Sequence, residues 1–287
     1  MAFSSGFTRG HGRYFRWTCG LVAAGLFALT VSIAEAQWGR RWRGGSPRFP
    51  TAVKTDRSFA FARVMFQSFR REPGGYGWST DYPLSDANFM IRLSELTTTP
   101  VSLGPHGEPN HVVVRLTDPE LFDYPFVFMS DVGTVFFTDD EAGGLRRYLE
   151  QGGFLWVDDF WGPAAWDTWR GEIRKALPSS QYPITDLSLD HPIFSGLFDL
   201  EGFPQIPSIQ HWRRSGGVTT SERGVRSAEP HFRGISDEEG RLMVLMTHNT
   251  DIADGWEREG EDTEYFHRFS IDAYAVGINV LMYAMTH

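Results

Sequence analysis

The sequence predicts one α/β domain with a mostly parallel sheet that is covered by helices. Two observations support this fold class. From Phe59 onward, short apolar segments alternate with segments whose apolar residues recur every three or four positions, which is the order of strands and helices in α/β proteins. The segment FLWV at 154–157 has no polar alternation, and such strands are typical of parallel sheets buried on both faces.

The first half of the domain contains three predicted strands and a helix. The strands are the apolar runs at 59–66, 111–116 and 125–130. Residues 84–96 predict a helix, because their apolar side chains share one face. Ser85 is the expected N-cap of this helix, since a serine hydroxyl can accept a free amide of the first turn.

The next unit has clear start and stop signals. The sequence TDDE at 138–141 matches a capping box that begins a helix. Gly152 and Gly153 are placed to end this helix before the 154–157 strand. Pro163 suits the first turn of the helix that follows.

The last third of the chain has a different character. Residues 178–215 are rich in proline, glycine and aromatic residues, which indicates a long ordered excursion and not a second domain. A strand at 241–249 and a closing helix at 270–285 follow. The prediction is therefore a single domain over residues 58–287.

The N-terminal segment is expected to be a secretory signal. Residues 1–36 combine an arginine-bearing start, an apolar stretch of small and branched residues and an A-x-A pattern that ends at Ala36. We expect cleavage there and a secreted or periplasmic protein; an uncleaved anchor is the alternative. Residues 37–57, rich in Arg, Gly and Pro, are expected to form a flexible leader.

Charge and composition limit the function. The formal net charge is −9, which makes the chain a poor general binder of nucleic acid or anionic membrane. Cys19 is the single cysteine and lies within the predicted signal, so no thiol chemistry is expected in the mature chain. The sequence contains no H-E-x-x-H, P-loop or G-x-G-x-x-G motif. It therefore predicts no cofactor, no metal site and no transmembrane segment in the mature chain.

The first candidate site is the pair Asp158 and Asp159 at the end of the predicted buried strand. Ligands of open α/β sheets bind at the C-terminal ends of strands; alternatively, the carboxylates accept turn amides or cap the helix at Pro163. Because successive strand residues point to opposite faces, we expect different roles. Asp158 should face a crevice, within roughly 8 Å of Asn249 or Asp251, and Asp159 should hold the turn.

Other candidates accompany this pair. The phrase THNTDIADGWE offers Asn249, Asp251 and Trp256 as ligand-binding residues, and Trp161 lies directly after the aspartates. Aromatic rings beside carboxylates suit sugar rings, although tryptophan more often packs in a core. His191, in LDHPIF, is a candidate general base; the alternative is a simple turn before Pro192.

Several phrases together resemble a bacterial family known as domain of unknown function 4159. They are FARVMF, FTDDEAGGLRRYLEQGGFLWVDDFWG, LDHPIF, THNTDIADGWE and AVGINVLMYAMTH. Their order and spacing cover nearly all of residues 59–287. The resemblance implies a three-layer flavodoxin-like fold similar to class I glutamine amidotransferases, and it implies no established activity.

Catalysis of the amidotransferase type is not expected. Such an enzyme needs a cysteine on a sharp strand-to-helix turn, and the corresponding turn, VDDFWGP, carries Phe160. The leading interpretation is therefore a non-catalytic binding or assembly module. Its partner would be a small molecule, a carbohydrate or an envelope protein. The alternative is a hydrolase of a carbohydrate or cell-envelope substrate, with Asp158 or Asp159 as acid or base.

Overall fold

The computed structural model describes residues 46–51, 57–72 and 74–287. The predicted signal and most of the predicted leader lie outside these residues. Ser46–His287 forms one compact unit. Arg48 belongs to the predicted leader, yet its carbonyl accepts a hydrogen bond of 2.9 Å from the amide of Val113, in an edge strand of the sheet.

A seven-stranded sheet is the centre of this unit, with the strand order β3-β1-β4-β6-β9-β8-β7. The strands from β3 to β9 pair in parallel, whereas β8 and β7 are antiparallel. Their bounds are β1 Ala62–Val64, β3 Val112–Val114, β4 Phe126–Ser130, β6 Phe154–Phe160, β7 Thr185–Asp186, β8 His231–Ser236 and β9 Leu242–His248. A separate pair joins β2, Gln67–Ser68, to β5, Val135–Phe136.

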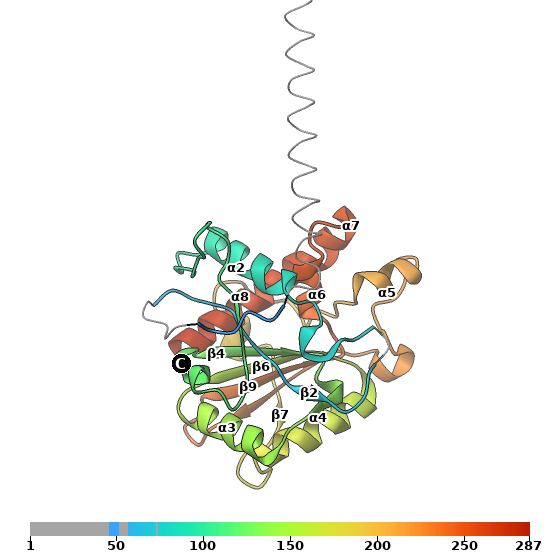
Figure 1. Cartoon of the computed structure of the whole chain (residues 1–287). Helices are drawn as coiled ribbons and strands as arrows, with labels where there is room; N and C mark the ends of the chain where they lie inside the picture. The colour runs from blue at the N-terminus through green and yellow to red at the C-terminus, as the bar shows by residue number, and fades with distance from the viewer. Residues whose placement is uncertain (1–45, 52–56, 73) are drawn as a thin grey trace, which may run out of the picture. The chain divides into compact units, whose positions relative to one another are not determined.

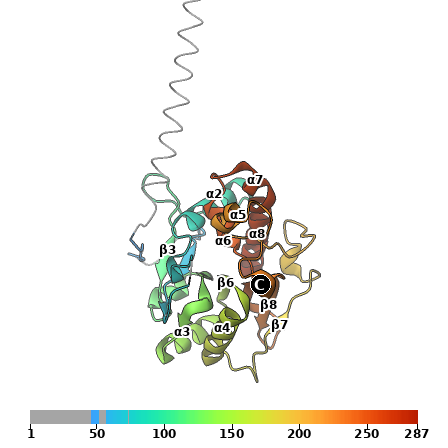
Figure 2. The same cartoon turned by 90° about the vertical axis from the view of Figure 1, so that its right-hand side faces the viewer.

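Helices cover both faces of the sheet, as Figures 1 and 2 show from two directions. The helices are α2 Leu84–Leu96, α3 Asp139–Glu150, α4 Gly162–Ala176, α5 Ile209–Arg214, α6 Ile252–Glu257, α7 Thr263–Tyr265 and α8 Ile271–Thr286. Helices α3 and α4 bury Leu145 and Trp169 against one face. Helices α2, α6 and α8 bury Phe89, Trp256 and Val280 against the other. The predicted three-layer, mostly parallel α/β fold is confirmed.

The strand order fixes where a ligand can bind. The chain forms β1, then β3 on one side of it, then β4 on its other side. The parallel part therefore reverses direction between β1 and β4, which is the flavodoxin-like order. Residues that follow β1, β4, β6 and β9 meet at the C-terminal edge of the sheet, where open α/β folds bind ligands.

Most local predictions are confirmed, with two corrections. The helix at 84–96 and the capping box at Thr138 and Glu141 are present. Ser85 is not the N-cap: the helix begins after Pro83, and Ser85 is buried inside its first turn. The antiparallel strand β8 was not predicted, because its alternating burial lies in a polar, glycine-containing segment.

One described stretch, Thr263–Thr286, is long and apolar enough to cross a membrane by length and composition. In the structure, 61 % of its most apolar window is buried. Its main part, α8, packs on the sheet through Val276, Val280 and Leu281. The same test is passed by core helices of globular proteins, and the packing of α8 fits that role.

A buried ion pair connects the sheet to the loop before α2. Arg63 in β1 is fully buried and donates to both carboxylate oxygens of Asp86 in α2. Its remaining donors bond Ser85 Oγ and the carbonyls of Trp78 and Thr80. The guanidinium therefore holds the loop that ends at the beginning of α2. This loop contains Asp81.

Replacing Asp86 with asparagine should destabilise the protein by about 3–5 kcal/mol, because it leaves the Arg63 charge buried without its counter-ion. Urea unfolding measures this change. The matched control is Glu95→Gln on the same helix, whose carboxylate pairs with Arg92 in an exposed position and should matter by less than about 1 kcal/mol. Equal losses in the two variants would contradict the role given to Arg63.

Candidate functional site

Six aspartates lie at the C-terminal edge of the sheet, and we call them the aspartate site. Two belong to β6, and the other four lie in the loop before α2, directly after β4 and at the beginning of α6. The members are Asp81, Asp131, Asp158, Asp159, Asp251 and Asp254. Burial, followed by repulsion from other members of the group, raises the pKa values of Asp81, Asp159 and Asp251.

The backbone of the site has an unusual conformation. Within the described chain, the non-glycine residues with positive φ are Asp81, Asp131, Asp159 and Asn249, with φ between 54° and 63°. Three belong to the aspartate site and the fourth is next to it. Non-glycine residues adopt this left-handed region at a cost in energy, and such strain clusters at functional sites.

Asp158 is fully buried beneath the site. Its Oδ1 accepts a hydrogen bond of 2.5 Å from the hydroxyl of Thr247, and its Oδ2 accepts one of 3.0 Å from the amide of Ala253, in the first turn of α6. Burial raises its pKa to about 7, although these two hydrogen bonds act to lower it. Asp158 therefore connects β6 to α6, and the expectation that it faces the crevice is wrong.

Asp159 is the partly exposed member of the pair. Its Oδ1 accepts a hydrogen bond of 2.9 Å from the indole of Trp161. Burial of the carboxyl, followed by repulsion from Asp81 and Asp131, raises its pKa well above the usual range. Asp159, and not Asp158, is thus the more exposed of the two, which is the opposite of what strand alternation predicted. The reason is the irregular register between Val157 and Phe160 and the φ of 54° at Asp159.

Asn249 takes the role predicted for Asp159. Its Oδ1 accepts the amide of Gly162 at the beginning of α4, at 2.7 Å, and its Nδ2 donates to the carbonyl of Glu229. Both ends of the amide are used, so the prediction that Asn249 contacts a ligand is corrected to a positioning role. Trp161 does border the site, through its bond to Asp159.

Two other predicted residues lie elsewhere. Trp256 is fully buried and packs against Phe89 and Trp156, so it belongs to the core and not to a binding surface. His191 caps the short helix Pro192–Phe194 and contacts the ring of Tyr283. The Tyr283 hydroxyl accepts a hydrogen bond from the amide of Leu242, at the beginning of β9. His191 therefore lies near the opposite end of the sheet from the aspartates.

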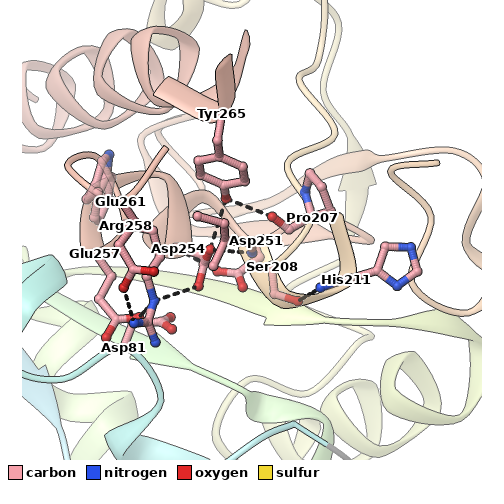
Figure 3. A network of polar contacts seen from close by, with 12 residues as sticks. Asp81, Pro207, Ser208, His211, Asp251, Asp254, Glu257, Arg258, Glu261 and Tyr265 are labelled. Carbon is pink, nitrogen blue, oxygen red and sulfur yellow. Dashed lines mark hydrogen bonds and ion pairs between the residues drawn. The ribbon is translucent and has the colours of Figure 1, made fainter. Parts of the chain in front are cut away.

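The beginning of α6 presents two carboxylates side by side (Figure 3). Asp251 is the N-cap of α6 and accepts the amide of Asp254 at 2.9 Å. Asp254 Oδ2 accepts from the hydroxyl of Tyr265 at 2.9 Å and from the amide of Ile209 at 2.8 Å. Burial raises the pKa of Asp254 to about 7 and that of Asp251 well above the usual range.

Asp81 completes a set of three carboxylates that could hold a metal ion. One oxygen each from Asp81, Asp251 and Asp254 lies within 4.8 Å of the others. The pKa of Asp81 is raised well above its usual range by burial and by Glu257. Arg63 and Arg258 both lower the pKa of Asp81. Arg258 lies 3.7 Å from Asp254 Oδ1 and also pairs with Glu257 and Glu261. We call Asp81, Asp251 and Asp254 the cation triad.

Sequence reasoning did not single out Asp81, Asp131 or Tyr265. Asp131 follows a predicted strand directly, as Asp158 does, and the same rule applied to every strand end would have found it. Asp81 lies in a loop far from any strand end in the sequence. Tyr265 lies after the THNTDIADGWE phrase, and no local signal places its hydroxyl beside Asp254.

The fold and the site define an α/β domain with a cluster of aspartates at its strand ends. The chain belongs to the family described as Domain of unknown function (DUF4159), whose model matches residues 60–285. No curated protein matches the chain. The predicted family membership is thus confirmed.

Replacing Asp158 with asparagine should change how stability depends on pH. The pKa of the folded carboxyl is about 7, above its ordinary 3.8. This group's contribution to stability is therefore present below pH 3.8 and is lost as the pH rises through 7. Between pH 5 and pH 8, in EDTA, the free energy of unfolding should fall by about 2–3 kcal/mol more in the wild type than in Asp158→Asn.

Urea unfolding at the two pH values measures this difference. The control is Asp167→Asn on the exposed face of α4, which should follow the wild type at both pH values. A constant gap between wild type and Asp158→Asn from pH 5 to pH 8 would show that Asp158 is ionised in the folded protein throughout.

Proposed function

We propose that this chain is an exported, non-catalytic binding module whose aspartate site takes up a divalent cation through Asp81, Asp251 and Asp254. The observation that carries this proposal is the 4.8 Å limit on the separations of their oxygens. Export is proposed from the pattern of residues 1–36. The ion would be Ca²⁺, Mg²⁺ or Mn²⁺, because the donors are carboxylate oxygens only.

The spacing suits one cation shared by the three carboxylates. Metal–oxygen bonds of about 2.0–2.6 Å allow ligand oxygens up to about 5 Å apart around one ion. Inverting glycosidases need carboxyls about 6.5–9.5 Å apart and retaining ones about 5–5.5 Å. The oxygens of the cation triad lie within 4.8 Å, inside the range for one ion.

The charges around the triad favour an added cation. Burial and neighbouring carboxylates raise the pKa of each of the three aspartates, so each carboxyl holds its proton more tightly than a free aspartic acid does. Arg258 pairs with Asp254 but is shared with Glu257 and Glu261, and Arg63 is paired with Asp86. A divalent ion would replace the bound protons, since metal ligands must be deprotonated.

A non-catalytic role is supported by the turn after β6. Phe160 occupies the place of an amidotransferase nucleophile and is buried. Asp158 and Asn249, which precede and face this turn, use their polar atoms to join β6, α4 and α6. The turn is therefore built to position the crevice.

Titration of EDTA-treated protein with CaCl₂, MgCl₂ or MnCl₂ should show binding of at least one ion at pH 8, with a Kd in the micromolar to millimolar range. Binding should weaken at pH 5.5, because protons compete for the carboxylates. Asp251→Asn should weaken it at least tenfold while the fold persists, since the asparagine oxygen can still accept the Asp254 amide. Isothermal titration calorimetry measures these affinities.

The control for this experiment is Asp167→Asn, which removes an exposed carboxylate on α4 and should bind the ion as the wild type does. The proposal fails if none of the three ions binds at pH 8. It also fails if Asp251→Asn binds as tightly as the control.

A hydrolase is the second candidate, and the state of Asp159 favours it. This carboxyl is partly exposed, and its pKa is raised by burial and by Asp81 and Asp131. A carboxylic acid that keeps its proton near neutral pH can serve as a general acid. The Trp161 indole orients it. A hydrolase would act on a carbohydrate or cell-envelope substrate.

An assay for reducing ends released from envelope polysaccharides distinguishes the binding module from the hydrolase. The binding module should release none above a heat-treated control. Release that falls at least about 100-fold in Asp159→Asn, but not in Asp167→Asn, would replace the binding module with the hydrolase.

A further inference from the structure

A cavity of about 470 Å³ lies at the reversal point of the strand order. Its walls come from the loop after β1 and from Asp131 and Thr134 after β4. The pairing of β2 with β5 joins these two segments. Outside the carboxyl ends of β1 and β4 is where the topology of an open α/β sheet leaves a ligand crevice, and the volume suits a small organic ligand.

Two aromatic side chains line this cavity and remain open to solvent. Tyr76 is 76 % exposed and Phe69 is 59 % exposed. Aromatic rings have flat apolar faces, and exposed ones in a concavity favour ligands that have an apolar face and a polar edge. Saccharide rings have this character, since their C–H faces are apolar and their rims carry hydroxyls.

The polar part of the lining contains one available positive charge. Arg70 donates to the carbonyl of Gly133 and pairs with Glu72. Arg71 is exposed and makes no ion pair within the described part of the chain. An exposed guanidinium without an ion pair can bind a carboxylate through two parallel hydrogen bonds.

Carboxylates in the same lining narrow the ligand class further. Glu72 and Asp131 both border the cavity, so a phosphate with two charges would meet two negative groups close to Arg71. Sugar hydroxyls, in contrast, can donate to these carboxylates. A ring with several hydroxyls and one carboxylate matches the whole lining.

We infer that this cavity binds a saccharide that carries a carboxylate on its ring, with Arg71 bound to the carboxylate and Tyr76 and Phe69 against the ring. Asp131 accepts from a ring hydroxyl. This inference goes beyond the cation proposal, because none of these contacts uses the cation triad.

Calorimetric titration of the whole protein in EDTA tests the inference. The probes are oligosaccharides of galacturonate, mannuronate and guluronate, and of hyaluronan, with neutral cello- and malto-oligosaccharides for comparison. At least one acidic set should bind, and more tightly than either neutral set. Tyr76→Ala should weaken this binding at least fivefold, and Arg71→Gln should remove the preference for acidic sugars.

Matched controls are Phe122→Ala, a partly exposed ring outside the cavity, and Arg170→Gln on the exposed face of α4; both should bind as the wild type does. The inference is overturned if no acidic set binds, or if Tyr76→Ala and Arg71→Gln bind like their controls. Binding that requires CaCl₂ and is lost in Asp251→Asn, but not in Tyr76→Ala, would assign the sugar to the cation triad instead.

Discussion

The site depends on one constraint: aspartates that repel one another are wholly or partly buried together where four parallel strands end. Each buried carboxylate needs hydrogen bonds or a positive charge to replace the water that it loses. Amides of the first turn of α6 and the hydroxyls of Thr247 and Tyr265 supply part of it. Arg258, 3.7 Å from Asp254, supplies a further part, yet burial still raises the pKa values of Asp158 and Asp254 to about 7. An added cation would serve the same purpose, which links the stability of the fold to its proposed ligand.

The surrounding fold must hold the segments that carry these aspartates in fixed positions. Arg63 holds the loop that leads to Asp81, and Asn249 holds the beginning of α4 next to Asp159. Left-handed backbone occurs at Asp81, Asp131 and Asp159, three of the six members of the aspartate site, and such conformations cluster at functional sites. The strain is therefore part of how the crevice is built, and the mostly parallel sheet is the rigid element that maintains it.

The sequence predicts the fold well and the site partly. Apolar strands and capping signals are local, so the helix at 84–96 and the Thr138 capping box could be read directly. The Asp158–Asp159 pair was found because a visible strand ends there. Their roles could not be assigned, because the irregular register after Val157 breaks the alternation on which the argument depended. Asp81 is brought to the site only by tertiary contacts, which no local pattern encodes.

The most direct test of the account is to locate the ion. Crystals grown with MnCl₂ should give an anomalous difference peak bounded by the carboxylate oxygens of Asp81, Asp251 and Asp254, with metal–oxygen distances of about 2.0–2.6 Å. The Asp251→Asn variant, crystallised in the same way, should lose this peak. A map with no peak between these three carboxylates in the wild type at pH 8, although the ion occupies other positions on the surface, would contradict the central claim.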